Sequence, residues 1–556
     1  MPAKIIIIGG VAGGATAATR ARRLDESAEI IIFERGEYIS FANCGLPYYI
    51  GNTIRKRNDL FMTSSEALRE RYNLDVRIFS EVTKIDRQKK QVEVIDRISG
   101  KTYYESYDKI ILSPGAEPVK PPLPGIDMEN IFRLRSIPDT DRIKSYIDIK
   151  KPKSAVIVGA GFIGLEMAEN LVKRGVTTVI IEMLDQVMAP LDFEMAAIVH
   201  EYIEQKGVKC ELGNGVKSFD RKGKQIIIST ANEKELKCDI VLLSIGIKPE
   251  NKLAKECGLA TGSRGGIIVD SSMRTSDPDI FAVGDAVELK DYITGLPVMT
   301  ALAGPANKQA RIAADNALGR NSIFKGTQGT AIVKIFDLVV ACTGANEKML
   351  KANNIPYRAS ITHSASHASY YPGADTMSIK ILFSPADGKL LGAQVVGAEG
   401  VDKRIDILAT AIRAGMTVYD LEEIEHAYAP PFSTAKDPVN IAGFAASNIL
   451  KGDVASISWN EIGSLGTESV FLDVRDKPEL KSEGCIKGAI NIALNDLREK
   501  LHELDKTKTY FIFCAAGLRS YIGCRILTQN GFKAKNISGG FTTYMYIKDT
   551  IKITTN

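Results

Sequence analysis

The sequence predicts an α/β protein built from several domains, and three observations support this fold class. Two short apolar strands, about 150 residues apart, each run into a glycine-rich turn and then a helix. Near residue 326 the pattern changes to longer alternating strands, followed by helices. The last hundred or so residues return to short strands that alternate with helices. A chain of 556 residues is too long for one hydrophobic core, so two to four domains are expected.

The composition is that of an ordinary soluble globular protein, with 45% apolar and 25% charged residues. The net charge of +4 is too small to indicate a nucleic-acid or membrane partner. No stretch reaches the roughly 18 apolar residues of a membrane span, and the N-terminal apolar run is too short for a signal peptide. Eight irregularly spaced cysteines favour a reducing cytoplasm, and no metal is expected.

The first glycine-rich turn carries Gly9, Gly10 and Gly14 after a run of four isoleucines. A second strand ends at Glu34, about 20 residues past the turn. This is the arrangement of a Rossmann unit, in which the helix N-terminus faces a pyrophosphate and the carboxylate binds ribose hydroxyls. One departure is that Val11 stands where a second glycine is usual.

The second turn, in SAVIVGAGFIGLEMAE, has Gly159, Gly161 and Gly164 in full G-x-G-x-x-G register. The strand that follows ends at Glu182, which favours a free ribose 2′-hydroxyl and therefore NADH. No arginine stands in the residues directly after Glu182 to bind a 2′-phosphate. NADH is therefore preferred, and NADPH remains open.

Three further segments resemble those of flavoprotein reductases that bind two dinucleotides. DKIILSPGAEP and DIVLLSIGIKPE resemble the two crossings between the nucleotide domains, and TSDPDIFAVGDAVE, with Gly284 and Asp285, resembles the second FAD motif. The resemblance implies FAD in the first domain, held partly by Asp285, and NAD(P)H in the second. The expected domains are FAD-binding (1–117 and 247–325), NAD(P)H-binding (118–246), dimerisation (326–446), a linker (447–457) and a further α/β domain (458–556).

A single cysteine, Cys44, lies in SFANCGLPYYIG, where a flavin disulfide reductase carries two cysteines five apart. Tyr49 occupies the second position, so the atom bonded to the Cys44 sulfur has to come from outside the chain. It is either a sulfenate oxygen or a thiol held as a mixed disulfide. The sulfenate form belongs to NADH peroxidases and oxidases, which place a histidine in the first glycine turn where this chain has Ala12.

The stretches SFANCGLPYYIG and IIGGVAGGATAATRARRL closely resemble coenzyme A-disulfide reductases. The resemblance implies that Cys44 is the nucleophile and rests as a mixed disulfide with CoA. The CoA contacts of that family map onto Thr16, Arg20, Arg23, Ser40 and Asn43. The alternatives are a solvated basic helix end for the two arginines and turn chemistry for Ser40 and Asn43.

Two later segments, HASYYPGAD and HAYAPPFSTAKDPVN, belong to the predicted dimerisation domain. The resemblance places Tyr370 and Tyr428 over Cys44 of the partner subunit as proton donors to the leaving thiolate, with Lys436 among the substrate contacts. Tyr371 competes with Tyr370 for this role. Histidines 363, 367 and 426 are expected to be structural.

The C-terminal segment carries LDVR and the loop CAAGLRS between a strand and a helix, and it resembles a rhodanese domain. Backbone N–H groups of the loop, with Arg519, would form an anion nest that stabilises the Cys514 thiolate and its persulfide. Cys485 stands where rhodaneses often have histidine. Cys485 and Cys524 are either extra thiols near the site or buried packing.

The whole chain therefore resembles a CoA-disulfide reductase fused to a rhodanese domain, acting as a homodimer with its active site shared across the interface. The expected function is NAD(P)H- and FAD-dependent reduction of CoA disulfide, CoA persulfide or polysulfide, with sulfane sulfur handled at Cys514. Persulfide and polysulfide are favoured because a plain disulfide reductase needs no sulfurtransferase. The alternatives are an NADH oxidase or peroxidase with a Cys44 sulfenate, and a persulfide carrier or sensor.

Overall fold

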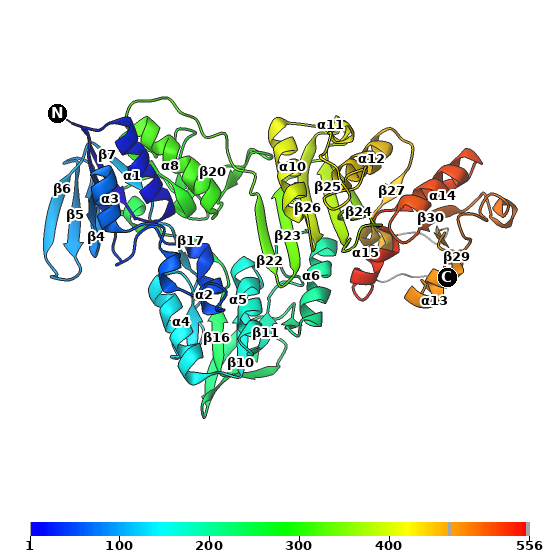
Figure 1. Ribbon diagram of the computed structural model, residues 1–556, viewed down its shortest axis with the longest axis horizontal. Helices are drawn as coiled ribbons and strands as arrows, with labels where there is room; N and C mark the ends of the chain where they lie inside the picture. Colours follow the sequence, from blue (N-terminus) through cyan, green and yellow to red (C-terminus); the bar gives the residue numbers. More distant parts are fainter. Residues whose placement is uncertain (1, 465–468, 552–556) are drawn as a thin grey trace. The chain divides into compact units, whose positions relative to one another are not determined.

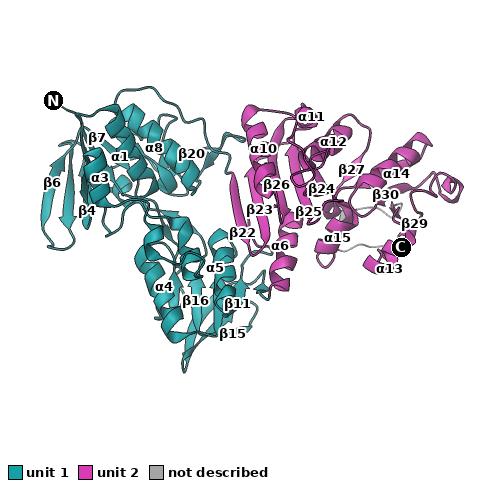
Figure 2. Ribbon diagram, viewed as in Figure 1, with its two compact units in different colours: residues 1–185, 207–329 teal, residues 186–206, 330–556 magenta. Residues whose placement is uncertain are grey.

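The computed structural model describes residues 2–464 and 469–551 (Figure 1), so the remaining parts of the expected domains lie outside the described residues. The chain divides into two compact units, residues 1–185 with 207–329 and residues 186–206 with 330–556 (Figure 2). The first unit holds two parallel sheets, and the second holds one antiparallel and one parallel sheet. The predicted α/β class, with a discontinuous first nucleotide domain, is confirmed.

The first sheet of unit 1 has the strand order β19-β7-β1-β2-β3, and all its pairs are parallel. Its strands are β1 (Lys4–Ile8), β2 (Glu29–Phe33), β3 (Asp75–Arg77), β7 (Lys109–Leu112) and β19 (Ile280–Ala282). The isoleucines of β1 are almost fully buried, as expected for a central parallel strand covered on both faces. Because β19 pairs with β7 across 160 or so intervening residues, the first domain is completed by a distant segment.

Helices cover this sheet, and two of them matter for the site. α1 (Ala12–Leu24) packs against α8 (Ala303–Ala317) through small alanine-rich faces. The other elements of the domain are α2 (Leu46–Ile50), α3 (Ser65–Tyr72), β4 (Ser80–Asp86), β5 (Gln91–Asp96), β6 (Thr102–Ser106), α7 (Lys252–Glu256), β18 (Ile267–Ile268), β20 (Val287–Lys290) and β21 (Pro297–Val298).

The second sheet of unit 1 has the order β12-β11-β10-β16-β9, again with parallel pairs. Its strands are β9 (Ile131–Arg133), β10 (Ser154–Val158), β11 (Thr177–Ile181), β12 (Lys209–Glu211) and β16 (Ile240–Leu243). The helices α4 (Ile137–Lys150) and α5 (Phe162–Lys173), and the hairpin strands β13 (Val216–Lys222), β14 (Gln225–Thr230) and β15 (Glu235–Cys238), accompany it. The two crossings predicted from sequence pair antiparallel as β8 (Ala116–Pro118) and β17 (Ile247–Pro249).

Unit 2 begins with a five-stranded antiparallel sheet of order β22-β23-β26-β25-β24. Its strands are β22 (Ala331–Ile335), β23 (Leu338–Gly344), β24 (Arg358–Ala365), β25 (Thr376–Phe383) and β26 (Leu390–Gly397). Its helices are α6 (Phe193–Gln205), α9 (Glu347–Ala352), α10 (Val401–Ala414), α11 (Val418–Glu423) and α12 (Pro438–Leu450). Residues 186–206, including α6, belong to this unit although the chain passes through them within the predicted NAD(P)H domain.

A buried lysine explains how residues 186–206 are held in unit 2. Lys380 of β25 is fully buried, and its Nζ lies 3.0 Å from Asp192, 2.7 Å from Glu194 and 2.5 Å from Glu347. Asp192 also accepts a hydrogen bond from the Gln394 side chain. One ammonium group therefore joins the start of α6 to the sheet, and its own burial is offset by three carboxylates.

The last domain is a parallel sheet of order β27-β31-β30-β28-β29. Its elements are β27 (Ser456–Ile457), β28 (Ser469–Asp473), α13 (Lys477–Glu483), β29 (Ile490–Asn491), β30 (Thr509–Phe513), α14 (Leu518–Gln529), β31 (Lys533–Ile537) and α15 (Gly540–Ile547). The domain docks on β24, where His363 shares a 2.8 Å hydrogen bond with Thr543 and the Ile361 N–H donates to Ser538.

Candidate functional site

The first glycine turn is built so that only glycine fits at its key positions. Gly9 has φ +100, and a Cβ there would lie 2.2 Å from the carbonyl oxygen of Ser113. Gly14 packs directly against the Gly9 carbonyl. The Gly10 N–H donates a 2.9 Å hydrogen bond to Glu34, so the turn and the predicted ribose-binding carboxylate form one structure.

A cavity of about 620 Å³ opens at this turn. Among its lining residues are Gly9, Gly13, Glu34, Asn43, Gly284 and Asp285. The first turn of α1 contains no acidic residue that would repel a phosphate, and burial raises the pKa of Asp285, which also lines the cavity. A helix N-terminus, a ribose-binding carboxylate and a second carboxylate in a cavity of this size fit FAD.

The second glycine turn repeats the arrangement on β10 and α5. Gly159 has φ +104, with the Ser244 carbonyl 2.2 Å from where a Cβ would lie, and Gly164 packs on the Gly159 carbonyl. Gly161 caps α5 and faces open space. Glu182 accepts hydrogen bonds from the N–H groups of Ala160 and Leu184, at 2.8 and 2.9 Å. These residues fit a second dinucleotide with a free ribose 2′-hydroxyl.

Cys44 lies in a short 3-10 turn (Asn43–Gly45) just before α2, and it is exposed. Desolvation raises the pKa of its thiol, and the carboxylates of Glu166 and Asp285 raise it further. The nucleophilic role predicted for Cys44 requires a lowered pKa. The chain's own side chains act in the opposite direction, so the oxidised flavin is the group expected to lower the pKa.

Glu166, on α5, is a neighbour of Cys44 that the sequence did not single out. The Tyr48 hydroxyl on α2 donates a 3.1 Å hydrogen bond to Glu166. Burial raises the pKa of Glu166 to about 7, and the Tyr48 hydrogen bond opposes this rise. Glu166 lies two residues after Gly164, the last glycine of the second motif, and this position is the signal that could have drawn attention to it.

The residues predicted to bind CoA from α1 have different environments. The Thr16 hydroxyl donates a 2.5 Å hydrogen bond to Asn307 on α8. Arg20 pairs with Asp315 on the same helix at 2.7 Å, whereas Arg23 is exposed. Of the two predicted arginines, Arg20 therefore already has a carboxylate partner within the chain.

The other two predicted CoA contacts flank Cys44. Ser40 adopts a left-handed conformation with φ +45, and its N–H donates to the Gly10 carbonyl. Asn43 is exposed and lines the large cavity. The structure brings Ser40 to the first glycine turn and places Asn43, the residue before Cys44, at the cavity.

Tyr370 and Tyr428 come together in unit 2, although 58 residues separate them. Their hydroxyl groups lie 3.0 Å apart, and the side chains are 75% and 48% exposed. Tyr371 instead packs edge-on against the His367 ring. Lys436 is exposed beside this region. Tyr370 and Tyr428 therefore form a pair of phenols, and Tyr371 is not part of it.

A buried arginine holds the segments that carry the two tyrosines. Arg404 of α10 donates to the Ser366 carbonyl at 3.0 Å and to the Asp437 carboxylate at 2.9 Å. Ser366 begins the segment that leads to Tyr370, and Asp437 follows the segment that carries Tyr428. One guanidinium group thus fixes both segments.

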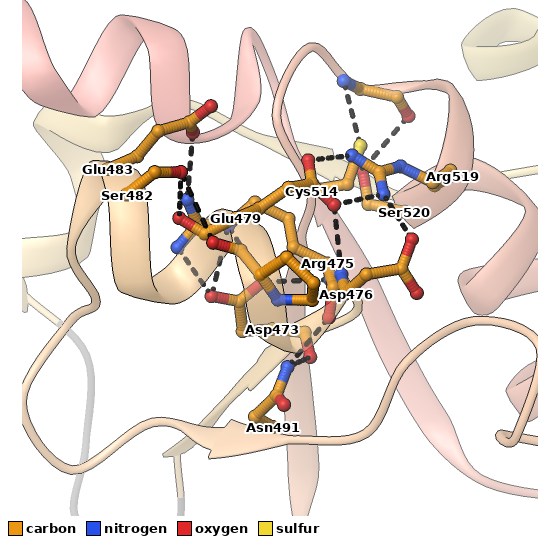
Figure 3. A network of polar contacts seen from close by, with 12 residues as sticks. Asp473, Arg475, Asp476, Glu479, Ser482, Glu483, Asn491, Cys514, Arg519 and Ser520 are labelled. Atoms are coloured by element: carbon orange, nitrogen blue, oxygen red, sulfur yellow. Dashed lines mark hydrogen bonds and ion pairs between the residues drawn. The ribbon is translucent and has the colours of Figure 1, made fainter.

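Cys514 begins the loop between β30 and α14 and is 2% exposed. Its Sγ accepts hydrogen bonds from the Gly517 N–H at 3.1 Å and the Ser520 hydroxyl at 3.5 Å (Figure 3). Gly517 has φ +117, a conformation that favours glycine and aims its N–H at the sulfur. The loop therefore offers neutral dipoles at a helix N-terminus, as the predicted anion nest requires.

Arg519, the charged member of the predicted nest, forms a bidentate ion pair with Glu479 of α13 (Figure 3). Sequence reasoning missed Glu479. Its place in the first turn of the helix after LDVR is a weak signal, because acidic residues are common there.

The two extra thiols of this domain differ in exposure. Cys485 is exposed, whereas Cys524 of α14 is buried, and burial raises its pKa. The proximity of Cys514 raises the pKa of Cys524 further. Cys524 packs in the same hydrophobic cluster as Cys514.

Two features are absent from the part of the chain that the structure describes. Within residues 2–464 and 469–551, no three His, Cys, Asp or Glu side chains are grouped as metal ligands. Within the same ranges, no helix has both the length and the hydropathy to cross a membrane.

Comparison with known families identifies three segments of the chain. The pyridine nucleotide-disulphide oxidoreductase family matches residues 3–314, and its dimerisation domain matches residues 330–438. The rhodanese-like domain matches residues 460–545.

Three similar proteins agree with these matches. A coenzyme A disulfide reductase of Staphylococcus haemolyticus is 36% identical over 447 residues, which cover 80% of this chain and all of the relative. The structure of reduced Bacillus anthracis CoADR-RHD is 48% identical with a TM-score of 0.96, over 99% of both chains. An NAD-dependent persulfide reductase from A. fulgidus is 38% identical with a TM-score of 0.91, over 97% of this chain and 100% of the other.

Proposed function

The chain belongs to the pyridine nucleotide-disulphide oxidoreductase family, as a coenzyme A disulfide reductase with a C-terminal rhodanese domain. We propose that its task is the NADH-dependent reduction of persulfides and polysulfides. Reduction of CoA disulfide is an activity of the same site. Support for the persulfide substrate comes from the similarity to an NAD-dependent persulfide reductase along 97% of the chain.

One observation carries the proposal: a single thiol, Cys44, lies beside the flavin cavity, and a second thiol, Cys514, lies in a loop suited to persulfide. With Tyr49 in place of a second cysteine, the sulfur bonded to Cys44 has to come from the substrate. A separate loop that can carry sulfane sulfur would be of no use to an enzyme limited to CoA disulfide.

The residues have these roles in the proposed cycle. NADH and FAD supply the two electrons of each turnover. The Cys44 thiolate attacks the CoA-bound sulfur of CoA persulfide, forming a Cys44–CoA mixed disulfide and releasing hydrosulfide. Two electrons and one proton then break the mixed disulfide into the Cys44 thiolate and free CoA. With CoA disulfide, the first leaving group is CoA thiolate.

Cofactor and substrate contacts follow from the geometry. Gly9, Gly10, Gly14, Glu34, Gly284 and Asp285 would hold FAD, and Gly159, Gly161, Gly164 and Glu182 would hold NADH. Thr16, Arg20, Arg23, Ser40, Asn43 and Lys436 would contact CoA. Because Arg20 forms an ion pair with Asp315, the exposed Arg23 is the better candidate to bind a phosphate group of CoA.

We also propose a homodimer in which Tyr428 donates the proton to the thiolate that leaves the partner's Cys44. The support is the matched dimerisation domain and a cluster of exposed aromatic side chains in unit 2. The cluster comprises Tyr370, Tyr371, Tyr428 and Phe432, which are 75%, 44%, 48% and 70% exposed. Large exposed aromatic groups are typical of protein interfaces.

The intact mass of the purified protein, before and after reducing agent, tests the proposal. One reversible CoA adduct per chain, absent in Cys44→Ser, would establish the mixed disulfide. A bare mass, or a single added oxygen on Cys44, would instead favour the oxidase or peroxidase alternative. Hydrosulfide release from CoA persulfide with NADH then tests the physiological substrate.

A further inference from the structure

The guanidinium of Arg519 is paired with carboxylates at the Cys514 loop. Nη1 and Nη2 donate to the two oxygens of Glu479 at 2.6 and 2.5 Å. Asp476 lies 3.5 Å from Nη1 as a second partner. Bidentate pairs of this kind are among the strongest charge-assisted hydrogen bonds in proteins.

Glu479 is itself held in position, so the pair is not a chance surface contact. Its Oε2 accepts a 2.9 Å hydrogen bond from the Asp476 N–H at the start of α13. Arg519 lowers the pKa of Glu479 to about 2, so the carboxylate stays ionised throughout the neutral range. Its side chain is only 26% exposed. Glu479 therefore stays charged and in place at neutral pH, and it keeps its ion pair with Arg519.

The second arginine near the loop is also engaged. Arg475 has no exposed side-chain surface, and it pairs with Asp473 at 2.8 Å and with Glu483 at 3.2 Å (Figure 3). Two guanidinium groups thus face four carboxylates: Asp473, Asp476, Glu479 and Glu483. Within this network the carboxylates outnumber the guanidinium groups.

The groups that contact the sulfur itself are neutral. The Gly517 N–H and the Ser520 hydroxyl point at Sγ and can stabilise one negative charge, on a thiolate or on a persulfide. A donor such as thiosulfate brings a further anionic group directly bonded to the sulfur that is transferred. A cation would have to balance that group, and the charge of Arg519 is already paired with Glu479.

We propose that Glu479 determines the sulfur-donor specificity of the Cys514 site by occupying Arg519. The site then favours organic persulfides, in which the transferable sulfur is bonded to a thiol sulfur on carbon, over inorganic donors such as thiosulfate. This inference rests on the proposed sulfane-sulfur role of Cys514. In the transfer, the Cys514 thiolate attacks the outer sulfur of R–S–SH, the S–S bond breaks, and the products are Cys514–S–SH and R–S⁻.

The test measures the rate of persulfide formation at Cys514 in the full-length holoenzyme by mass spectrometry, with thiosulfate or glutathione persulfide as donor. Glu479→Gln keeps an oxygen for the Asp476 N–H but removes the charge that holds Arg519. Its rate with thiosulfate is expected to rise at least about tenfold, the effect of one charge-assisted hydrogen bond. With glutathione persulfide the rate should change by less than about threefold, because that donor needs no second cation.

Two further variants show whether the gain depends on Arg519. In Glu479→Gln/Arg519→Gln the thiosulfate gain should disappear. Glu483→Gln also removes a negative charge from α13, but this residue pairs with Arg475 and not with Arg519. It should change the ratio of the thiosulfate rate to the glutathione persulfide rate by less than about twofold. Thermal unfolding and the circular-dichroism spectrum of each preparation report whether the rhodanese domain is folded.

The proposal is overturned if both donors change equally, if the gain survives the double substitution, or if Glu479→Gln stops loading from both donors. Wild-type protein that loads both donors at similar rates would also overturn it, with the sulfur-carrying role of Cys514 intact. If wild-type Cys514 accepts sulfur from neither donor, the proposed role of Cys514 itself fails.

Discussion

The Tyr48 hydroxyl donates a 3.1 Å hydrogen bond to Glu166, a carboxylate whose charge raises the pKa of the Cys44 thiol. α2, which carries Tyr48, and α5, which carries Glu166, pack together, so the interaction is part of the fold of unit 1. The redox thiol is therefore coupled to a group that titrates near neutral pH.

Glu166→Gln should make Cys44 more reactive. Removing the negative charge lowers the pKa of Cys44, so more thiolate is present at pH 7.5. The alkylation rate of reduced protein should rise about two- to fivefold at that pH and converge with wild type below pH 6, where Glu166 is protonated. Glu70→Gln, an exposed carboxylate on α3, is the control, and an unchanged rate for Glu166→Gln would contradict the coupling.

Tyr428→Phe should lower CoA-disulfide turnover by about 10²-fold, because the leaving thiolate loses its proton donor. Tyr371→Phe should stay within about twofold, since Tyr371 packs on His367 outside the phenol pair. The CoA adduct measured by intact mass should remain in both variants. Equal losses in the two variants would indicate packing rather than proton transfer.

Lys380→Met should destabilise unit 2 by about 3–5 kcal/mol, because the buried Asp192 and Glu194 and the largely buried Glu347 lose the ammonium group that they share. Lys351→Met is the matched control: Lys351 also contacts Glu347 but is 65% exposed, and its loss should cost less than about 1 kcal/mol. Denaturant unfolding of the two variants measures the difference. A similar loss of unfolding free energy in the two variants would show that the buried cluster does not hold residues 186–206 against the sheet.

Acid should loosen the docking of the rhodanese domain on β24 through His363. Desolvation lowers the pKa of His363 to about 4, below the 6.5 of an unfolded histidine. The unfolded or undocked form therefore binds the proton more readily between these values. The contribution of neutral His363 to the stability of the docked domain is full above pH 6.5. It falls as the pH drops toward 4, by at most about 3 kcal/mol.

Hydrogen exchange at α15, which carries Thr543, should report this loosening as faster exchange at pH 5 than at pH 7 after correction for intrinsic rates. In His363→Gln the difference between the exchange rates at pH 5 and pH 7 should shrink. His502→Gln, a substitution of an exposed histidine in the same unit, should leave it unchanged. A pH dependence that survives in His363→Gln would assign it to another group.

Cys514→Ser should abolish loading of sulfane sulfur while CoA-disulfide turnover remains within about twofold of wild type, because the two reactions use different thiols. Cys485→Ser, which removes an exposed thiol of the same domain, should retain loading. If turnover with small disulfides fell together with loading, the two sites would not be chemically separate.

Much of the site could be predicted because its signals are local in sequence. Gly9 and Gly159 each require φ near +100 with a carbonyl where a side chain would be, and only glycine meets that requirement. The strand before each turn and the carboxylate after the next strand follow at fixed spacing. The Cys514 loop is likewise contained in a few residues between a strand and a helix.

The pairings between distant elements could not be predicted in this way. Tyr48 and Glu166 are 118 residues apart, and Arg519 and Glu479 are 40 apart, so neither pair has a spacing rule. The sequence indicated a charged Arg519 beside Cys514, and the fold shows that α13 supplies the carboxylate that engages it. Local backbone requirements are determined by neighbouring residues in the sequence. The charge and the pKa values of a site depend instead on which side chains the packing of remote elements brings within a few ångströms.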